Sequence, residues 1–256
     1  MQAIVLAGGF AKRLQPLSSR TAKPLLKVGG RAIIDYVVDK VMDVEDLGKI
    51  LISTNLRFKE QFEEWLESRN LLNASLVVEP SVREEEKPGA VAALARITEG
   101  IKDNCLVIAG DNLFTSSLRP LVERFRITGK PVVGIYNLGD RELAKQYSTI
   151  SVGSDGRIVR FVEKPADPES TLIGTAIYIL PQSVLPKLRE FAEASPDRDS
   201  PGRFIEWLYR KEPTYGVTLE GQWWDIGTID EYAKVNRMMD NGRAEGRLHS
   251  QHATSS

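Results

Sequence analysis

The chain has 256 residues, of which 42% are hydrophobic and 27% charged, and its formal net charge is -1. A chain of this length and composition can bury a full core in one large domain or two small ones. The near-zero net charge excludes a general attraction to nucleic acid, so no nucleic-acid partner is expected. The single cysteine, Cys105, excludes an intramolecular disulfide, and its apolar neighbours predict a core position.

No apolar run in the sequence approaches the roughly 18 residues that a membrane span needs. The chain opens on a strand-like pattern with no basic segment before it, which is not the pattern of a signal peptide. We therefore expect no membrane partner and a cytoplasmic location.

The first apolar run, residues 3–7, has the β-branched content of a buried strand and ends at Gly8 and Gly9. A glycine turn after such a strand exposes backbone N–H groups at the sheet edge where ligands bind. Glycine suits this place because its backbone can adopt a positive φ and come close to a ligand. Lys12 and Arg13 follow, and a guanidinium group binds phosphate oxygens in pairs. The stretch predicts an anion site, with a plain tight turn as the alternative, because it matches neither common phosphate-loop motif.

Strand-like and helix-like patterns then alternate up to residue 140. Strands are predicted over residues 49–53, 75–78, 105–109 and 132–136, and helices over residues 33–42, 57–70, 89–99 and 117–128. This alternation predicts an α/β fold with a mainly parallel, Rossmann-like open sheet and helices on both faces. The polar segment 81–89 is typical either of a solvated, mobile surface loop or of a lid over a ligand.

The pattern changes after residue 140, where a β-hairpin signal, Gly153 to Gly156, lies between two short strands. The elements predicted here are strands over 149–152, 157–162, 172–180 and 217–219, helices over 184–194, 203–211 and 228–239, and a loop over 221–227. We therefore interpret residues 1–240 as one domain with a first part, 1–140, and a smaller β-hairpin/α part, 141–240. The polar tail, 241–256, is expected to be disordered, with His249 and His252 solvated.

Four acidic or basic residues need more than their local pattern to be interpreted. Asp111 follows the strand at 105–109, so it shares a sheet edge with the first glycine loop. It is either a turn or helix-cap residue or a ligand of Mg²⁺, which takes one or two carboxylates together with phosphates and waters. From the residues alone, Asp225 is an ordinary turn aspartate, and Glu163 and Lys164 are solvated charges.

The longer string LAGGFAKRLQPLSSRTAKPLLKVGG, residues 6–30, is far more specific. It resembles the N-terminal signature of the sugar-phosphate nucleotidyltransferases, such as glucose-1-phosphate thymidylyltransferase and mannose-1-phosphate guanylyltransferase, which has the form GGxGTRLxPLT followed by KPLLPV. The matching residues are Gly8, Gly9, Arg13, Leu14, Pro16, Leu17, Lys23, Pro24, Leu25 and Leu26. Ala11 and Lys12 stand where glycine and threonine or serine are usual, and a positive φ at Ala11 would cost about 1–2 kcal/mol.

Three later elements extend the resemblance, which covers residues 3–232. Gly110-Asp111 matches the family's G-D element, Phe161–Pro165 its F-x-E-K-P element and Trp223–Thr228 its W-x-D-[IT]-G-T element. The resemblance implies that Asp111 and Asp225 hold Mg²⁺ between them. It also implies that Glu163 bonds the hydroxyl groups of a sugar and that Lys164 binds the sugar phosphate.

The resemblance implies further roles in the first part of the chain, which would bind the nucleotide. Arg13 and Lys23 would contact the triphosphate, and Lys12 could add charge there. The backbone of Gly8 and Gly9 would approach the nucleotide. The second part would bind the sugar phosphate.

The chain departs from the family pattern on the sugar side. Tyr147 is followed by Ser148, where the family often has glycine after the tyrosine. The family's N-A-G-[IL]-Y strand corresponds to Gly174–Tyr178, so Ala176 replaces a glycine. Glycines such as Gly174 let sugar hydroxyls reach the backbone, and side chains at the other positions would reshape the acceptor pocket.

The implied reaction joins a nucleoside triphosphate to a sugar 1-phosphate with release of pyrophosphate. The expected substrates are glucose 1-phosphate with a thymidine or uridine triphosphate, and the second choice is guanylyl transfer to mannose 1-phosphate. A phosphorylated amine or polyol acceptor, or a non-catalytic nucleotide-binding regulatory subunit of the same fold, are the alternatives. No hexapeptide repeat follows residue 240, so no β-helix acyltransferase domain is expected, and the sequence leaves a homo-oligomer open.

Overall fold

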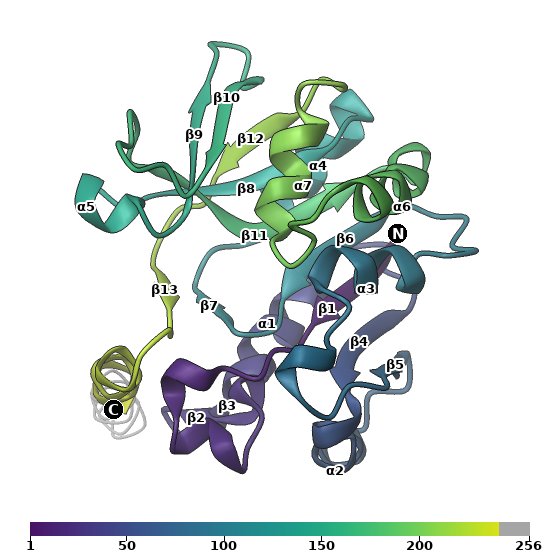
Figure 1. The fold of residues 1–256 in the computed structure, drawn as a ribbon, viewed down its shortest axis with the longest axis vertical. Helices are drawn as coiled ribbons and strands as arrows, with labels where there is room; N and C mark the ends of the chain where they lie inside the picture. The colour runs from purple at the N-terminus through teal and green to yellow at the C-terminus, as the bar shows by residue number, and fades with distance from the viewer. Residues whose placement is uncertain (241–256) are drawn as a thin grey trace, which may run out of the picture.

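The structure, a computed structural model, describes residues 1–240. Its centre is a nine-stranded sheet (Figure 1). The parallel part has the order β6 (Cys105–Ala109), β1 (Gln2–Leu6), β4 (Ile50–Asn55) and β5 (Ala74–Glu79). β6 is apolar along its whole length, and β1 is apolar after Gln2, because both faces of the sheet are covered, as is usual for parallel strands.

The second half of the chain continues the same sheet in the antiparallel sense. The strand β11 (Leu172–Leu180) pairs with β6 and also with β8 (Val132–Asn137) and β9 (Ser148–Val152). β9 forms a hairpin with β10 (Ile158–Glu163), and β12 (Tyr215–Thr218) runs parallel to β8. The mainly parallel α/β sheet predicted from the sequence is confirmed. The division at residue 140 stays an interpretation, because one sheet takes strands from both parts.

Helices cover both faces of the sheet (Figure 1). One apolar cluster contains residues of α1 (Ile33–Met42), α2 (Lys59–Arg69) and α4 (Arg119–Thr128). The other contains residues of α3 (Ala90–Ile97), α6 (Leu185–Ala194) and α7 (Pro201–Leu208). Neighbouring residues of β1 enter opposite clusters, Val5 the first and Ile4 the second, because side chains alternate across a strand. Cys105 is fully buried in the second cluster, so its predicted core position is confirmed.

The short elements differ most from the sequence-based predictions. Residues 223–225, expected in a loop, form the strand β13 (Trp223–Asp225), which pairs with β7 (Asn112–Phe114). The helix predicted over residues 203–211 is α7, which begins at Pro201 because proline fits the first turn of a helix. Also present are β2 (Lys27–Val28), β3 (Arg31–Ala32), α5 (Arg141–Ala144) and a 3-10 turn at Glu84–Glu86 within the polar segment 81–89. Residues 229–240 are helical, and the tail 241–256 with its two histidines lies outside the described residues.

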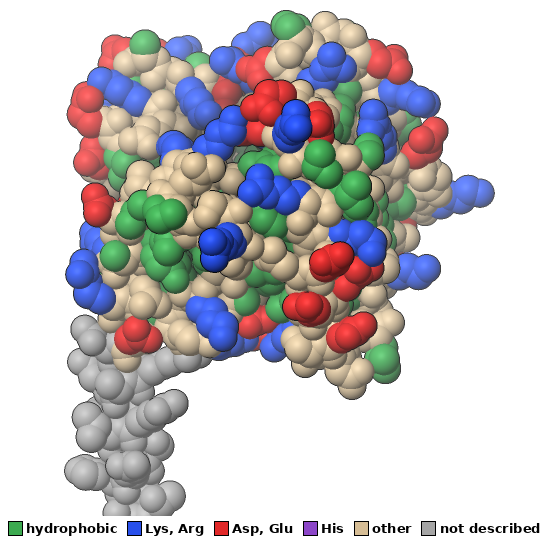
Figure 2. All heavy atoms as spheres, turned by 60° about the horizontal axis from the view of Figure 1, so that its bottom comes forward, with side chains coloured by type: hydrophobic (Ala, Val, Ile, Leu, Met, Phe, Trp, Pro, Cys, Tyr) green, Lys and Arg blue, Asp and Glu red, His purple; other side chains and the backbone are tan. Residues whose placement is uncertain are grey.

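The surface carries mixed charge on the face drawn in Figure 2, where lysine and arginine side chains are interspersed with aspartate and glutamate. This agrees with the near-zero net charge. Within residues 1–240, none of the helices has the length and apolar character needed to cross a membrane. The cytoplasmic location stays a prediction.

Candidate active site

The loop after β1 lies at the carboxyl end of the parallel strands. Neither Gly8 nor Gly9 uses the positive φ that glycine allows: the left-handed residue of this loop is Ala11, with φ 47° and ψ 48°. The carbonyl of Ala11 accepts hydrogen bonds from the N–H of Leu14 at 2.9 Å and from Oγ of Ser18 at 2.7 Å, which hold this strained turn. A Cβ placed on Gly9 would meet no atom within 4 Å, so the Gly9 backbone remains open to a ligand.

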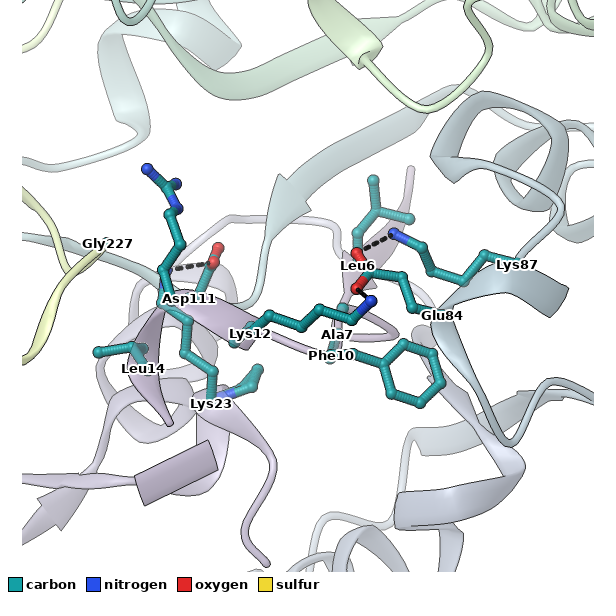
Figure 3. Close-up of a pocket in the computed structure, with 14 residues that line it drawn as sticks. Leu6, Ala7, Phe10, Lys12, Leu14, Lys23, Glu84, Lys87, Asp111 and Gly227 are labelled. Atoms are coloured by element: carbon teal, nitrogen blue, oxygen red, sulfur yellow. Dashed lines mark hydrogen bonds and ion pairs between the residues drawn. The ribbon is translucent and has the colours of Figure 1, made fainter. Parts of the chain in front are cut away.

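A cavity of about 320 Å³ opens against this loop (Figure 3). Its charged lining residues are Lys12, Arg13, Lys23, Glu84, Lys87 and Asp111. Gly9 lines the cavity and Gly8 does not. Four cationic and two anionic side chains around one cavity suit a polyanion that carries a metal cation.

Lys12 lies at this cavity and forms ion pairs with the polar segment 81–89. Its Nζ is 2.9 Å from Glu84 Oε2 and 3.2 Å from Glu85 Oε1. Lys87 approaches Glu84 from the other side, at 3.6 Å (Figure 3). Hydrogen bonds to Glu84 and Glu85 raise the pKa of Lys12. Segment 81–89 therefore contributes to the cavity wall, and Lys12 would have to leave these glutamates to bind a phosphate.

Lys23 lies between two carboxylates at the bottom of the site. Its Nζ is 2.7 Å from Asp111 Oδ2 and 3.7 Å from Asp225 Oδ1, and the residue is only 8% exposed. The two aspartates are more than 110 residues apart in the chain, and their approach to one ammonium group brings together the sequence-predicted metal ligands. Arg13 lies on the same side, since its guanidinium is 3.6 Å from the place that a Cβ on Gly227 would take.

The β7–β13 ladder explains how the two carboxylates meet. Asp225 is the register partner of Asn112, which directly follows Asp111. The side chains reinforce the ladder, because Trp223 Nε1 donates a hydrogen bond to Asn112 Oδ1 at 2.9 Å. Asn112 in turn donates to the carbonyl of Thr175 in β11. The pair Asp111 and Asp225 is thus attached to the central sheet.

The pKa shifts follow from burial and from the position of Lys23. Burial opposes ionisation of Asp111, but the nearby Lys23 outweighs it and holds the pKa of Asp111 below its usual value. Burial raises the pKa of Asp225, and the neighbouring charge of Asp111 adds to the shift, whereas the more distant Lys23 opposes it. Burial would lower the pKa of Lys23, but the two carboxylates raise it. Lys23 therefore neutralises the negative charge of Asp111 more fully than that of Asp225.

The predicted sugar-binding glutamate lies at the end of β10. Glu163 is 6% exposed, and its carboxylate accepts hydrogen bonds from the hydroxyls of Ser148 and Ser200, the latter at 2.7 Å. A side chain at Gly202 would overlap the Glu163 carboxylate, so the close approach of α7 requires glycine there. A sugar hydroxyl would therefore have to join or replace the two serines.

A second cavity, of about 380 Å³, adjoins these residues. Glu163, Lys164, Asp199 and Arg203 are among its lining residues. The Arg203 guanidinium contacts Asp197 at 3.2 Å and Glu206 at 2.9 Å. Gly174 lines neither cavity; a Cβ there would be 3.6 Å from Ser148 Cβ, so it lies behind the residue that bonds Glu163.

An ion pair joins the walls of the two cavities. Lys87, from the first, lies 3.3 Å from Asp199, from the second. The N–H of Val91 also donates to the carbonyl of Arg198 at 2.9 Å. The segment after β5 and the segment before α7 are thus bonded to each other beside the site.

The sequence model of the family described as nucleotidyl transferase matches residues 2–242. The chain belongs to this family. Similar proteins include a bifunctional protein GlmU from Methanocaldococcus jannaschii, 22% identical over 93% of this chain and 54% of the relative. A glucose-1-phosphate adenylyltransferase from Thermomicrobium roseum is 26% identical over 91% of this chain and 58% of the relative. The chain therefore spans about half the length of these family members.

A solved structure has the same fold as this family member. It is a crystal structure from Bacillus anthracis, assigned as a glucose-1-phosphate thymidylyltransferase in complex with sucrose, with a TM-score of 0.80. It is 24% identical and matches over 94% of this chain and 95% of its own. The agreement confirms the α/β fold.

The donor set of this family member fits Mg²⁺. Within residues 1–240 no group of three or more acidic, histidine or cysteine side chains is arranged to hold a metal ion. Mg²⁺, however, usually takes only one or two carboxylates and completes its octahedron with phosphates and waters. Asp111 and Asp225 offer hard oxygen donors beside a cavity rich in lysine and arginine. The ammonium of Lys23 already neutralises the same two carboxylates, which shows that this position favours a cation.

Several residues at or beside the site of this nucleotidyl transferase have little signal in the sequence. Glu84 and Lys87 were seen only as part of a polar segment, yet they line the first cavity. Tyr147 was noted only as part of a family element, and its hydroxyl donates to Asp225 at 3.1 Å. Glu79, at the end of β5, lies 3.4 Å from the place that a Cβ on Gly8 would take. Its position at the end of a strand is the one signal available for it in the sequence.

Proposed function

We propose that this protein transfers a nucleotidyl group from a nucleoside triphosphate to a sugar 1-phosphate and releases pyrophosphate. The observation that carries the proposal is the pair Asp111 and Asp225 around Lys23, beside a basic cavity. The wall of this cavity is joined by an ion pair to that of a second cavity, which Lys164 lines. Two anionic substrates need two adjoining sites with cationic side chains, and this arrangement supplies them.

The reaction needs no general base. A phosphomonoester has a second pKa of about 6, so the attacking phosphate oxygen is already ionised near neutral pH. That oxygen forms a bond to the α-phosphorus of the triphosphate, and the bond from the α-phosphorus to the bridging oxygen breaks, so that pyrophosphate leaves with the electron pair. The catalytic task is to hold two polyanions together and to neutralise the developing charge.

On the triphosphate side, Arg13 and Lys23 bind phosphate oxygens, and the open backbone of Gly9 allows close approach. Gly8 acts through its backbone beside the nucleotide, and Lys12 joins after release from its glutamates. Asp111 and Asp225 would hold Mg²⁺, which supplies positive charge to the phosphates. The exposed guanidinium of Arg13 forms no ion pair among the described residues, so it is available to a ligand.

On the acceptor side, Lys164 binds the phosphate of the sugar, and Glu163 accepts bonds from its hydroxyls. Lys164 has φ 48°, a strained backbone that the surrounding structure must hold, and such strain clusters at ligand-binding positions. Gly174 supports this side from behind Ser148. Arg203 also lines the adjoining cavity, but its ion pairs with two carboxylates offset its positive charge, so it attracts a phosphate less strongly.

The test is pyrophosphate release in the presence of Mg²⁺, over a grid of nucleoside triphosphates against glucose, mannose, galactose and glucosamine 1-phosphates. We expect release with one triphosphate and one acceptor, the first choice being glucose 1-phosphate with thymidine or uridine triphosphate. A grid without release, in a protein that still binds a triphosphate, would contradict the proposal and favour a regulatory subunit or an unusual acceptor.

The carboxyl group of Glu79 favours a second choice, guanylyl transfer. It lies beside Gly8, and Ser53 Oγ donates to its Oε1 at 3.1 Å. An ionised carboxylate only accepts hydrogen bonds. Guanine offers two adjacent donors on its pairing edge, whereas thymine and uracil offer one donor between two carbonyls. A carboxylate that contacts the base therefore favours guanine.

The variant Glu79→Gln separates the two choices of base. If Glu79 selects guanine, the variant should lose activity with guanosine triphosphate and gain relative activity with uridine triphosphate, because an amide both donates and accepts. Burial raises the pKa of Glu79, so the preference of the wild type for guanine should strengthen as the pH rises and the group ionises. An unchanged ratio between the two triphosphates would exclude this role for Glu79.

A further inference from the structure

Tyr147 lies where the metal-ligand pair and the acceptor side meet. It follows α5 and directly precedes β9, and it is half-buried. Its hydroxyl donates a hydrogen bond to Asp225 Oδ2 at 3.1 Å. The other oxygen of the same carboxylate, Oδ1, is the one 3.7 Å from Lys23 Nζ. Tyr147 therefore occupies one oxygen of Asp225 and leaves the other near Lys23.

The backbone of the same residue reaches the acceptor side. The carbonyl of Tyr147 accepts a hydrogen bond from the N–H of Lys164 at 3.1 Å. The next residue, Ser148, donates its hydroxyl hydrogen bond to Glu163. Two consecutive residues thus contact Asp225 at the end of β13, and Glu163 and Lys164 at the end of β10, on both substrate sides of the site.

The aromatic ring of Tyr147 has a separate, purely structural contact. It packs edge-on against Trp223, with ring centroids 5.5 Å apart and an interplanar angle of 80°. Tyr136 packs on the same tryptophan, with centroids 5.9 Å apart. Among residues 1–240, Asp225 has a hydrogen bond with the Tyr147 hydroxyl and none with that of Tyr136. The two tyrosines therefore share the packing role, and only one has the hydroxyl contact.

We propose that Tyr147 is a positioning residue that orients the Asp225 carboxylate for the metal and fixes it relative to Lys164 on the acceptor side. The inference rests on the proposed function for its catalytic consequence, and on geometry for its effect on the metal site. Without the hydroxyl, the Asp225 side chain keeps only its longer contact with Lys23, and its carboxylate is held less firmly. The bond from the Lys164 N–H to the Tyr147 carbonyl is a backbone contact, so it survives removal of the hydroxyl.

The test compares Tyr147→Phe with the matched control Tyr136→Phe in the full chain. Each variant loses one hydroxyl from a ring that packs on Trp223. The first readout is the affinity for Mn²⁺ alone, which is measured by electron paramagnetic resonance without substrates. We expect Tyr147→Phe to bind Mn²⁺ about tenfold more weakly, the lower end of the range for loss of one hydrogen bond to a charged group. Tyr136→Phe should bind it as the wild type does.

The second readout is the division between kcat and KM for the wild-type substrate pair. Tyr147→Phe should lower kcat about tenfold or more, while KM for the acceptor stays within about twofold because the backbone contact to Lys164 remains. Melting temperatures of both variants should lie close to the wild type, which separates a positioning role from a packing role.

Three results would overturn the inference: wild-type Mn²⁺ affinity and kcat in Tyr147→Phe, equal losses in both variants, or a wild-type protein that binds no Mn²⁺. The proposed function can fail separately. If no substrate pair reacts but Mn²⁺ affinity falls in Tyr147→Phe alone, the positioning role stands and the transferase activity does not.

Discussion

Replacement of Lys23 by methionine gives the sharpest test of the cation position between the aspartates. Methionine keeps the length and apolar stem of lysine and removes the charge. The variant leaves Asp111 and Asp225 facing each other without the ammonium that lies 2.7 and 3.7 Å from them. We expect the metal-free variant to be less stable than the wild type, and we expect a divalent cation to correct the loss.

The magnitude follows from burial. Removing one partner of a fully buried ion pair costs about 3–5 kcal/mol. The Lys23 side chain is 9% exposed, but those of Asp111 and Asp225 are 38% and 32% exposed, so water screens part of their repulsion. Discounted for this screening, the loss is about 2 kcal/mol. In a chain of this size that corresponds to a fall in melting temperature of about 4–8 °C.

The assay is thermal melting of both proteins, first with a chelator and then with increasing Mn²⁺ or Mg²⁺. A ligand at 100 times its Kd adds about 2.7 kcal/mol to the free energy of unfolding, enough to restore the variant. The wild type should gain less, because the ammonium of Lys23 competes for the same carboxylates. Equal melting temperatures under chelator, or equal gains from the metal, would refute the reasoning, while lost turnover in the variant is expected in either case.

The remaining predictions concern one residue each. Asp225→Asn should abolish turnover and melt at or above the wild-type temperature in chelator. The reason is that burial raises the pKa of Asp225, so the folded state binds its proton more tightly than the unfolded chain does. The wild type therefore loses stability as the pH rises from about 4 through the shifted pKa. Normal turnover in the variant would exclude Asp225 as a metal ligand. Lys164→Ala should mainly raise KM for the acceptor, and an unchanged acceptor KM would exclude its contact with the sugar phosphate. Gly202→Ala should lower the free energy of unfolding by about 1–3 kcal/mol in chemical denaturation, because its methyl group overlaps the Glu163 carboxylate and the Ser148 hydroxyl; a wild-type midpoint would mean that α7 can move away from Glu163.

The sequence predicts the central sheet well because its signals are local. Runs such as Cys105–Ala109 and the amphipathic stretch Ile33–Met42 identify their own strand and helix, and both have those bounds in the structure. The β7–β13 ladder was not predicted, because three-residue strands leave almost no periodic pattern. Its pairing depends on contacts between residues more than 100 positions apart.

The candidate site divides in a similar way. The family motifs predict that Asp111 and Asp225 lie close together, and the structure places both beside Lys23. The condition for strain at Ala11 is met, since its φ is 47°. The Ser148 and Ser200 contacts that enclose Glu163 could not be predicted, because they depend on how α7 packs against β10. The hydroxyl of Tyr147 has no signal in the sequence that points to Asp225.

The most direct test of the central claim is ³¹P nuclear magnetic resonance of the complete reaction for the substrate pair that releases most pyrophosphate. Nucleotidyl transfer predicts one nucleotide sugar, with its two coupled phosphorus signals, for each pyrophosphate formed, and none with the Asp225→Asn variant. Release of orthophosphate or free nucleoside monophosphate without a coupled diphosphate product would contradict the account, since it would mean hydrolysis rather than transfer to the sugar phosphate.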